Sequence, residues 1–288
     1  MSRLRRKLFG GSSRATDIAA PMLLMALILA GWELVVHVFA IPAYVLPPPT
    51  EIVAKIFEDW RIIFPHLQVT LFEIVAGYAL AAVVGFLLSI AIVYSRAFRR
   101  GVLPLIVAAQ TIPVIAIAPI LVIWFGYNYV PRIIITALVA FFPLTISIVT
   151  GLQALEAEFI NFFRSLNATG FQMFLKLRLP AALPNIFAGL KVATTLAVVG
   201  ATISEWVGAS AGLGYLMAQD SAQLNTTRVF SSLVVLGLCG MAFFASVGLV
   251  ERLCMPWVHG RLDLSWFGQR SSAKSSSADT NEASTRTN

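Results

Sequence analysis

Charged residues are scarce in this chain. Only 12% of its 288 residues are Asp, Glu, Lys or Arg, whereas 58% are hydrophobic and the mean hydropathy is +0.82. A soluble domain carries about 25% charged residues to cover its surface. Half that share excludes an ordinary soluble protein and indicates that much of the surface faces lipid. The net charge of +7 is therefore read by position along the chain, as a signal of membrane orientation and not of nucleic-acid binding.

The residues and motifs of catalysis are also scarce. Cys239 and Cys254 match no metal-site spacing and support no disulfide framework, so we expect them to serve packing. His37, His66 and His259 are scattered, and no metal site or nucleophile constellation assembles from them. The sequence has no G-x-x-x-x-G-K-[ST] phosphate loop. We therefore expect no catalytic residue, no cofactor and no metal ion, and any ATP hydrolysis must occur on another chain.

Long apolar stretches are what the chain has in abundance. A bilayer core of about 30 Å requires about 20 apolar residues in a helix. Six stretches meet this requirement: Ile18–Ala40, Leu67–Tyr94, Leu105–Phe125, Ile133–Gly151, Ile186–Val207 and Val229–Val250. The sequence thus predicts an all-α, polytopic membrane protein with six transmembrane helices over residues 18–257. A basic N-terminus, residues 1–17, precedes this domain, and a tail that we expect to be disordered, residues 258–288, follows it.

The distribution of Lys and Arg predicts the orientation. With the N-terminus inside, the inside segments carry sixteen of these residues: Arg3, Arg5, Arg6, Lys7, Arg14, Arg96, Arg99, Arg100, Arg164, Lys176, Arg178, Arg252, Arg261, Arg270, Lys274 and Arg286. The outside segments carry four, Lys55, Arg61, Arg132 and Arg228, and Lys191 lies in the fifth span. The positive-inside rule therefore places both termini in the cytoplasm.

Two stripes of small residues predict close helix packing. They recur every four residues in the second and fifth spans: Gly77, Ala81, Gly85 and Ser89, then Gly189, Ala193, Ala197 and Ala201. Such stripes let helix backbones approach closely in lipid. Pro113, Pro119 and Pro143 interrupt the third and fourth spans, and they suit either a water-lined pathway or plain kinks.

Two short amphipathic segments lie between the spans. On the outside, Glu51 to Arg61 predicts a helix started by Thr50 and lying flat on the membrane interface. In the cytoplasm, the segment 152–184 predicts two short helices around a turn at Asn167-Ala168-Thr169-Gly170. The second segment exposes aromatic residues, so it either packs back on its own bundle or docks a partner.

The cytoplasmic segment also carries a resemblance. The run F-F-R-S-L-N-A-T-G-F-Q-M-F-L-K-L-R-L-P resembles the signature Glu-Ala-Ala, three residues, Gly, nine residues, Ile-x-Leu-Pro of binding-protein-dependent ABC importer permeases. On this alignment Leu177 takes the Ile position and Asn167 the Gly position, and the poorly kept Glu-Ala-Ala falls on residues 161–163. Asn accepts the left-handed conformation of a turn more readily than other residues with a side chain. The resemblance implies that the residues which couple to the ATPase are Phe162, Phe163, Arg164, Asn167, Ala168, Gly170, Leu177, Leu179 and Pro180.

Further segments are similar to the same permease group in the same order. They are L-P-P-P-T-E-I, Q-T-I-P-V-I-A-I-A-P-I-L-V-I-W-F-G, A-F-F-P-L-T-I-S-I-V-T-G-L and G-A-T-I-S-E-W-V-G-A-S-A-G-L-G-Y-L-M. The resemblance implies the type I ABC importer permease fold in the inner membrane. It also implies the partners: cytoplasmic ATP-binding subunits, a second permease subunit forming a homodimer, an external substrate-binding protein and membrane lipid, but no nucleic acid.

The substrate is open at this stage. The run that begins at Glu205 is most similar to permeases for vitamin or cofactor precursors such as hydroxymethylpyrimidine or riboflavin; sulfonate, taurine or nitrate is the alternative. Glu205, Pro113 and Pro119 are candidate pathway residues, although a carboxylate wetted at the external interface is the plainer expectation for Glu205. A secondary transporter would need ionisable residues near mid-membrane, and its only candidates are Glu33, Glu73, Lys191 and Glu205.

Overall fold

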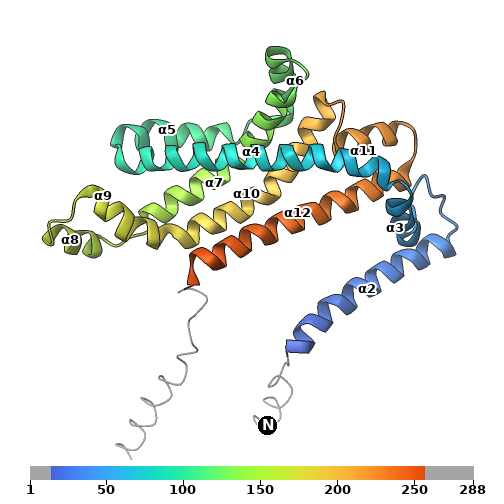
Figure 1. Ribbon diagram of the computed structural model, residues 1–288, viewed down its shortest axis with the longest axis horizontal. Helices are drawn as coiled ribbons and strands as arrows, with labels where there is room; N and C mark the ends of the chain where they lie inside the picture. The colour runs from blue at the N-terminus through green and yellow to red at the C-terminus, as the bar shows by residue number, and fades with distance from the viewer. Residues whose placement is uncertain (1–13, 257–288) are drawn as a thin grey trace, which may run out of the picture. The chain divides into compact units, whose positions relative to one another are not determined.

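The computed structural model describes residues 14–256, and every element in this range is a helix, which confirms the all-α class. In order these are α2 (Arg14–Val38), α3 (Pro49–Glu58), α4 (Trp60–Tyr94), α5 (Arg96–Ala109), α6 (Val114–Phe125), α7 (Tyr129–Gln153), α8 (Ala157–Ser165), α9 (Gly170–Met173), the π-helix η1 (Phe174–Arg178), α10 (Leu179–Gly208), α11 (Leu213–Ala222) and α12 (Thr226–Cys254) (Figure 1). The predicted tail, residues 258–288, and most of the predicted N-terminus, residues 1–17, lie outside the described residues. The chain divides into two units, residues 1–244 and 245–288, and all sites below lie in the first.

Five helices of the described range are long and apolar enough to cross a membrane: Ala19–Val38, Trp60–Tyr94, Tyr129–Gln153, Gly170–Gly208 and Thr226–Cys254. They correspond to the first, second, fourth, fifth and sixth predicted stretches. A sixth span results only if the bent pair α5 and α6 counts as one. The structure therefore confirms a polytopic helical membrane protein.

The third predicted span is not one continuous helix. Helices α5 and α6 meet at 99° across a break at residues 110–113. Pro113 precedes α6 with an extended backbone, ψ 113°. Proline lacks an N–H to donate and disfavours the helical conformation in the residue before it, so the α5 helix stops here.

Helix α3, which the sequence assigns to the outside, begins differently from the prediction. Pro48, not Thr50, occupies the N-cap position, and its side chain makes no capping hydrogen bond. Both the backbone N–H and the hydroxyl of Thr50 instead donate to the carboxylate of Glu33 in α2, at 3.1 and 2.7 Å. Ile52 is buried on this helix, while Val53 and Phe57 remain exposed. Thus only part of the apolar face of α3 packs against its own chain.

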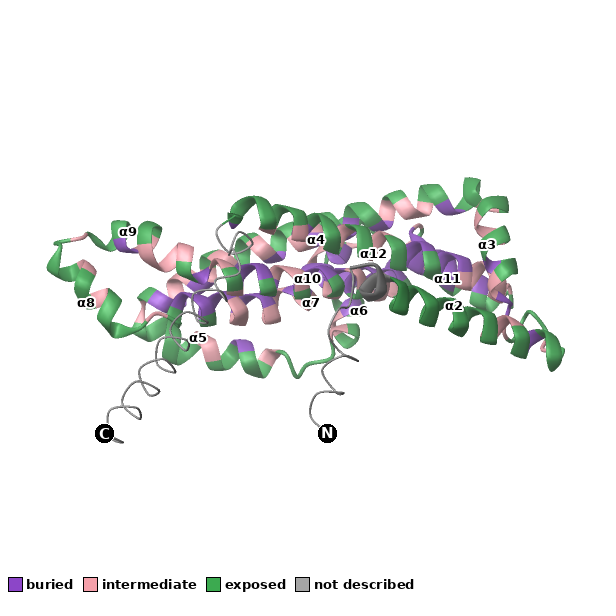
Figure 2. Cartoon of the chain, turned by 90° about the horizontal axis from the view of Figure 1, so that it is seen from below, coloured by how far each residue is buried: buried purple, intermediate pink, exposed green. Residues whose placement is uncertain are grey.

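Helix α7 forms the centre of the bundle, with α4 on one side and α10 on the other (Figures 1 and 2). All eight residues of the two predicted stripes are buried, which confirms the close packing. A Cβ atom built on Gly77 would lie 2.5 Å from Thr136, and one built on Gly189 would lie 2.5 Å from the Cβ of Ser147. Both neighbours belong to α7, so the glycines set the distance between the helix backbones.

Helix α2 contrasts with this centre. Val36 is its one buried residue among positions 19–38, and Figure 2 shows the helix exposed along its length. Its exposed side chains include Met22, Leu24 and Leu27, which are apolar. An apolar helix with so little cover from its own chain suits a surface that faces lipid.

Candidate functional site

Between the end of α7 and the start of α10, the short helices α8 and α9 project from the bundle (Figure 1). Together with η1 they form a bracket, which we define as residues 157–178. Helix α8 has no buried residue. Phe159, Phe162, Leu166 and Phe171 are between 53% and 71% exposed, and the Phe162 and Phe163 rings contact each other edge to face. The predicted two-helix arrangement is therefore present, and its aromatic face is not covered by the described part of the chain.

The turn of the bracket has the conformation that the sequence predicts. Asn167 has φ 55°, in the left-handed region, and its N–H donates to the carbonyl of Arg164 at 3.0 Å. Ala168 donates to the carbonyl of Phe163 at 3.1 Å, so the turn satisfies carbonyl groups at the end of α8. Thr169 and Gln172 then form a reciprocal capping box that starts α9.

The other candidate coupling residues lie on both arms of the bracket. Phe162, Arg164 and Gly170 are exposed, and Phe163 and Ala168 are half-buried. Leu177 lies in η1, and Leu179 and Pro180 open α10. The structure thus places seven of the nine candidates in the bracket, and Leu179 and Pro180 follow it directly at the start of α10.

Glu205 lies at the opposite end of the bundle and is 1% exposed, so the expectation of a wetted carboxylate is wrong. It sits in the last turn of α10 and reaches the first turn of α11. One carboxylate oxygen accepts from the hydroxyl of Thr70 at 2.6 Å, the other from the N–H of Gly214 at 2.5 Å, and the backbone of Tyr215 also bonds to it. The carboxylate therefore caps the N-terminus of α11, where helix N–H groups and the helix dipole favour an anion.

The connection between α10 and α11 folds tightly around this carboxylate. Gly212 has φ 126°, and a Cβ there would overlap the carboxylate of Glu205. A Cβ on Gly214 would lie 2.8 Å from the same group. The hydroxyl of Thr70 accepts from Leu213 at 2.7 Å, and Nδ1 of His66 accepts from the N–H of Gly212 at 2.9 Å. Helix α4 thus supplies the other half of the support for this loop.

A buried ion pair lies beside this loop. Nη1 of Arg132 on α7 is 2.5 Å from Oε1 of Glu73 on α4, and the two side chains are 6% and 0% exposed. Nε of Arg132 donates to the carbonyl of Asn128 at 3.1 Å, and its guanidinium lies 4.5 Å from the ring centroid of Tyr129. The sequence places Arg132 among the outside segments, and the structure places it in the first turn of α7 with its side chain buried. A charged side chain in a lipid-facing bundle requires a partner of opposite charge. Here Glu73 and Arg132 are each other's partner.

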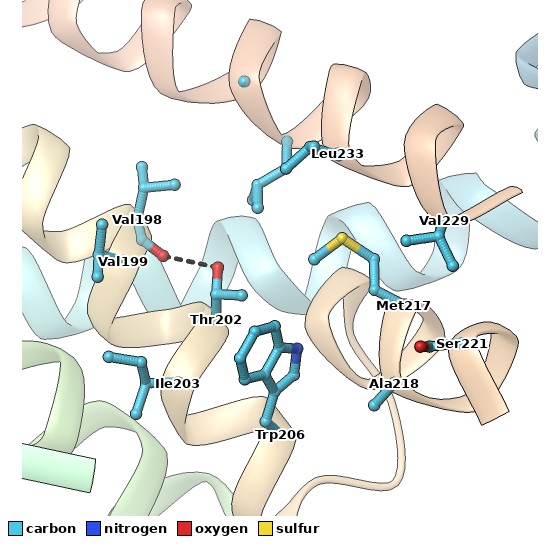
Figure 3. Close-up of a pocket in the computed structure, with 12 residues that line it drawn as sticks. Val198, Val199, Thr202, Ile203, Trp206, Met217, Ala218, Ser221, Val229 and Leu233 are labelled. Atoms are coloured by element: carbon cyan, nitrogen blue, oxygen red, sulfur yellow. Dashed lines mark hydrogen bonds between the residues drawn. The ribbon is translucent and has the colours of Figure 1, made fainter. Parts of the chain in front are cut away.

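A groove of about 860 Å³ opens between α10, α11 and α12 (Figure 3). The twelve residues that line it are Val198, Val199, Thr202, Ile203, Trp206, Met217, Ala218, Ser221, Val229, Leu233, Leu236 and Gly237. No charged side chain is among them. Trp206 is 56% exposed, and the hydroxyl of Thr202 donates to its own helix at the carbonyl of Val198. Glu205, Pro113 and Pro119 do not line this groove, and both prolines are exposed on or next to α6.

Comparison with known proteins decides the family. A model of the family described as "Binding-protein-dependent transport system inner membrane component" matches residues 77–259, well over half of the chain. The chain belongs to this family. It is thus the membrane-spanning permease of an ABC importer for small solutes, and its relatives are transport proteins.

Individual permeases of this family are similar over most of their length. A formylaminopyrimidine transport permease protein, ThiX, from Halalkalibacterium halodurans is 37% identical over 85% of this chain and 98% of its own. A putative aliphatic sulfonates transport permease protein, SsuC, from Bacillus subtilis is 30% identical over 82% and 86%. A riboflavin transport system permease protein, RibX, from Chloroflexus aurantiacus is 28% identical over 83% and 90%. These relatives confirm the resemblance to the vitamin-precursor and sulfonate group of permeases.

Sequence reasoning did not find the partners of the buried charges. Glu73 and Arg132 are 59 residues apart, and Thr70 and Glu205 are 135 apart. One signal was available: Glu73 and Glu205 lie within predicted apolar stretches, where an ionisable residue requires an internal partner because lipid offers none.

We predict that Gly212→Ala destabilises this permease. The added methyl group must adopt a strained backbone and displace the Glu205 carboxylate, at a combined cost on the order of 1–3 kcal/mol. The melting midpoint of the detergent-purified protein should fall. Gly101→Ala is the matched control, because Gly101 lies in α5 with open space around its Cβ direction. Equal melting midpoints for the two variants would contradict the account of the loop.

Proposed function

We propose that this permease imports a vitamin or cofactor precursor with a planar, uncharged ring, such as hydroxymethylpyrimidine or riboflavin. The observation that carries the proposal is the groove between α10, α11 and α12, which has no charged lining residue. The exposed indole of Trp206 offers a stacking surface for a flat ring, and Thr202 and Ser221 offer hydroxyl groups. The relatives named for formylaminopyrimidine and riboflavin support the same substrate class.

The alternative substrates are sulfonate, taurine and nitrate, which the sulfonate permease relative favours. An anionic group is normally held by Arg or Lys or by several N–H donors. The groove supplies no cation, and the N–H groups at the start of α11 already donate to Thr70 and Glu205. Charge complementarity therefore favours the uncharged ring.

The motor of the transporter is, in this proposal, a pair of separate ATPase subunits that dock on the bracket. Exposed aromatic residues on a short amphipathic helix suit a groove on a partner protein. The absence of a phosphate loop from the sequence requires such a partner. A second copy of the permease and an external substrate-binding protein complete the assembly.

The proposed orientation of the permease in the membrane places the bracket and both termini in the cytoplasm and α3 outside. A Cys placed at Glu58 should react with a membrane-impermeant maleimide from outside the cell only, since Glu58 is on the exposed side of α3. The matched control is a Cys at Glu158, an exposed Glu of α8, which should react only after the membrane is opened. Both variants need Cys239→Ala and Cys254→Ala, because both native thiols are free. The reverse pattern of labelling would overturn the orientation.

The substrate class is tested by uptake into proteoliposomes that contain the permease, the ATPase and the binding protein of its transport system. We expect ATP-dependent uptake of a labelled aminopyrimidine or flavin and none of taurine. Trp206→Ala should lower uptake about tenfold, the equivalent of a stacking energy of roughly 1.5 kcal/mol. Trp124→Ala is the control, since Trp124 is exposed on α6 away from the groove. Uptake of taurine but not of the ring compounds would refute the proposal.

The docking role of the bracket is tested at Asn167. A β-branched residue enters the left-handed conformation only at a cost of about 1–2 kcal/mol or more. Asn167→Gly should keep uptake near wild type, whereas Asn167→Val should weaken co-purification of the ATPase and abolish uptake. The side chain of Asn167 is exposed, so loss of core packing would not explain a difference. Equal uptake by the two variants at equal expression would exclude the turn as a determinant of docking.

A further inference from the structure

The segment of the bracket that joins α10 is not an α-helix. Residues 174–178 wind as the π-helix η1 between α9 and α10, so the chain from Gly170 to Gly208 is one helical run with a wider segment near its start. Such π-helical segments contain one residue more than the corresponding α-helical turn, and they occur often at functional sites. Here the segment lies between the arm that projects and the helix that packs in the bundle.

Two side chains of η1 reach the end of α4. The ring of Phe174 lies edge-on to the ring of Tyr94, with centroids 6.2 Å apart and an interplanar angle of 64°. The guanidinium of Arg178 lies 5.6 Å from the centroid of the same Tyr94 ring. Tyr94 is the last residue of α4, so both contacts are made at the point where that helix ends.

Arg178 also reaches the end of α7. Its Nη1 donates to the carbonyl of Leu152 at 3.4 Å, and Leu152 is fully buried in the last turn of α7. Nε of Arg178 is buried with no hydrogen-bond partner among the described residues. A buried donor without a partner costs free energy, so this site is not built for stability alone.

We propose that Arg178 is the positioning residue through which movement of the bracket reaches α4 and α7, with Tyr94 as its partner. The proposal rests on the proposed docking of the ATPase on the bracket. A tilt of α8 and α9 pivots at η1, and Arg178 of η1 contacts the ends of both neighbouring helices. The same two helices carry the buried ion pair, with Glu73 in the interior of α4 and Arg132 in the first turn of α7, so a displacement of either helix also acts on this pair.

The test separates docking from coupling. Arg178→Gln and Tyr94→Leu each remove the contact between the cation and the ring, and Tyr94→Phe keeps the ring. For each variant, three quantities are measured in the complete complex in proteoliposomes: the ATPase that co-purifies, the ATP hydrolysed, and the substrate taken up per ATP. The ATPase and the binding protein are those of the same transport system.

We expect Arg178→Gln and Tyr94→Leu to retain the bound ATPase but to lower uptake per ATP by up to about tenfold, the range given by a cation–π contact of roughly 1 kcal/mol and a lost hydrogen bond. Tyr94→Phe should match wild type, and the double variant Arg178→Gln with Tyr94→Leu should be no worse than either single one. An unchanged ratio of uptake to ATP in Arg178→Gln would overturn the proposal, as would a loss of bound ATPase in parallel with uptake. Failure of the wild-type chain to bind any ATPase would instead refute the docking role of the bracket.

Discussion

The bundle depends on how closely α7 can approach α4 and α10. The facing stripes on α4 and α10 carry only Gly, Ala and Ser, so backbone and short side chains of α7 contact them directly. In lipid the hydrophobic effect does not drive two helices together, because lipid tails are as apolar as leucine. Many small van der Waals contacts of about 0.1–0.2 kcal/mol per atom pair must do so instead, and they require short distances. A larger residue at Gly77 or Gly189 would remove that condition along much of the helix pair.

The close approach gives the two ends of the bundle different characters. At one end, buried charges are matched within the chain: Glu73 with Arg132, and Glu205 with the backbone of α11. At the other end, the bracket leaves apolar rings exposed. The helices between the two ends can transmit a displacement because their side chains are closely packed.

Features that depend on local sequence could be predicted, whereas features that depend on contacts between distant residues could not. The stripes at four-residue spacing and the turn at Asn167 follow from helix period and backbone sterics, and both are confirmed. The interruption of the third span at Pro113 is local too and was predicted, but hydropathy only counts apolar residues, so the 99° change in direction was not. The partners of Thr50, Arg132 and Glu205 come from other helices, and only the fold brings them together.

The cap on α11 has a consequence for how this protein can evolve. Glu205, Gly212 and Gly214 act as one structural unit, because the carboxylate fills the volume that a side chain at either glycine would need. While Glu205 is present, neither glycine tolerates a larger residue. Once Glu205 is replaced by a small residue, both positions gain room, although Gly212 still has its unusual backbone angle. Substitutions in this loop are therefore expected to be order-dependent, with the glutamate changing first and the glycines only afterwards.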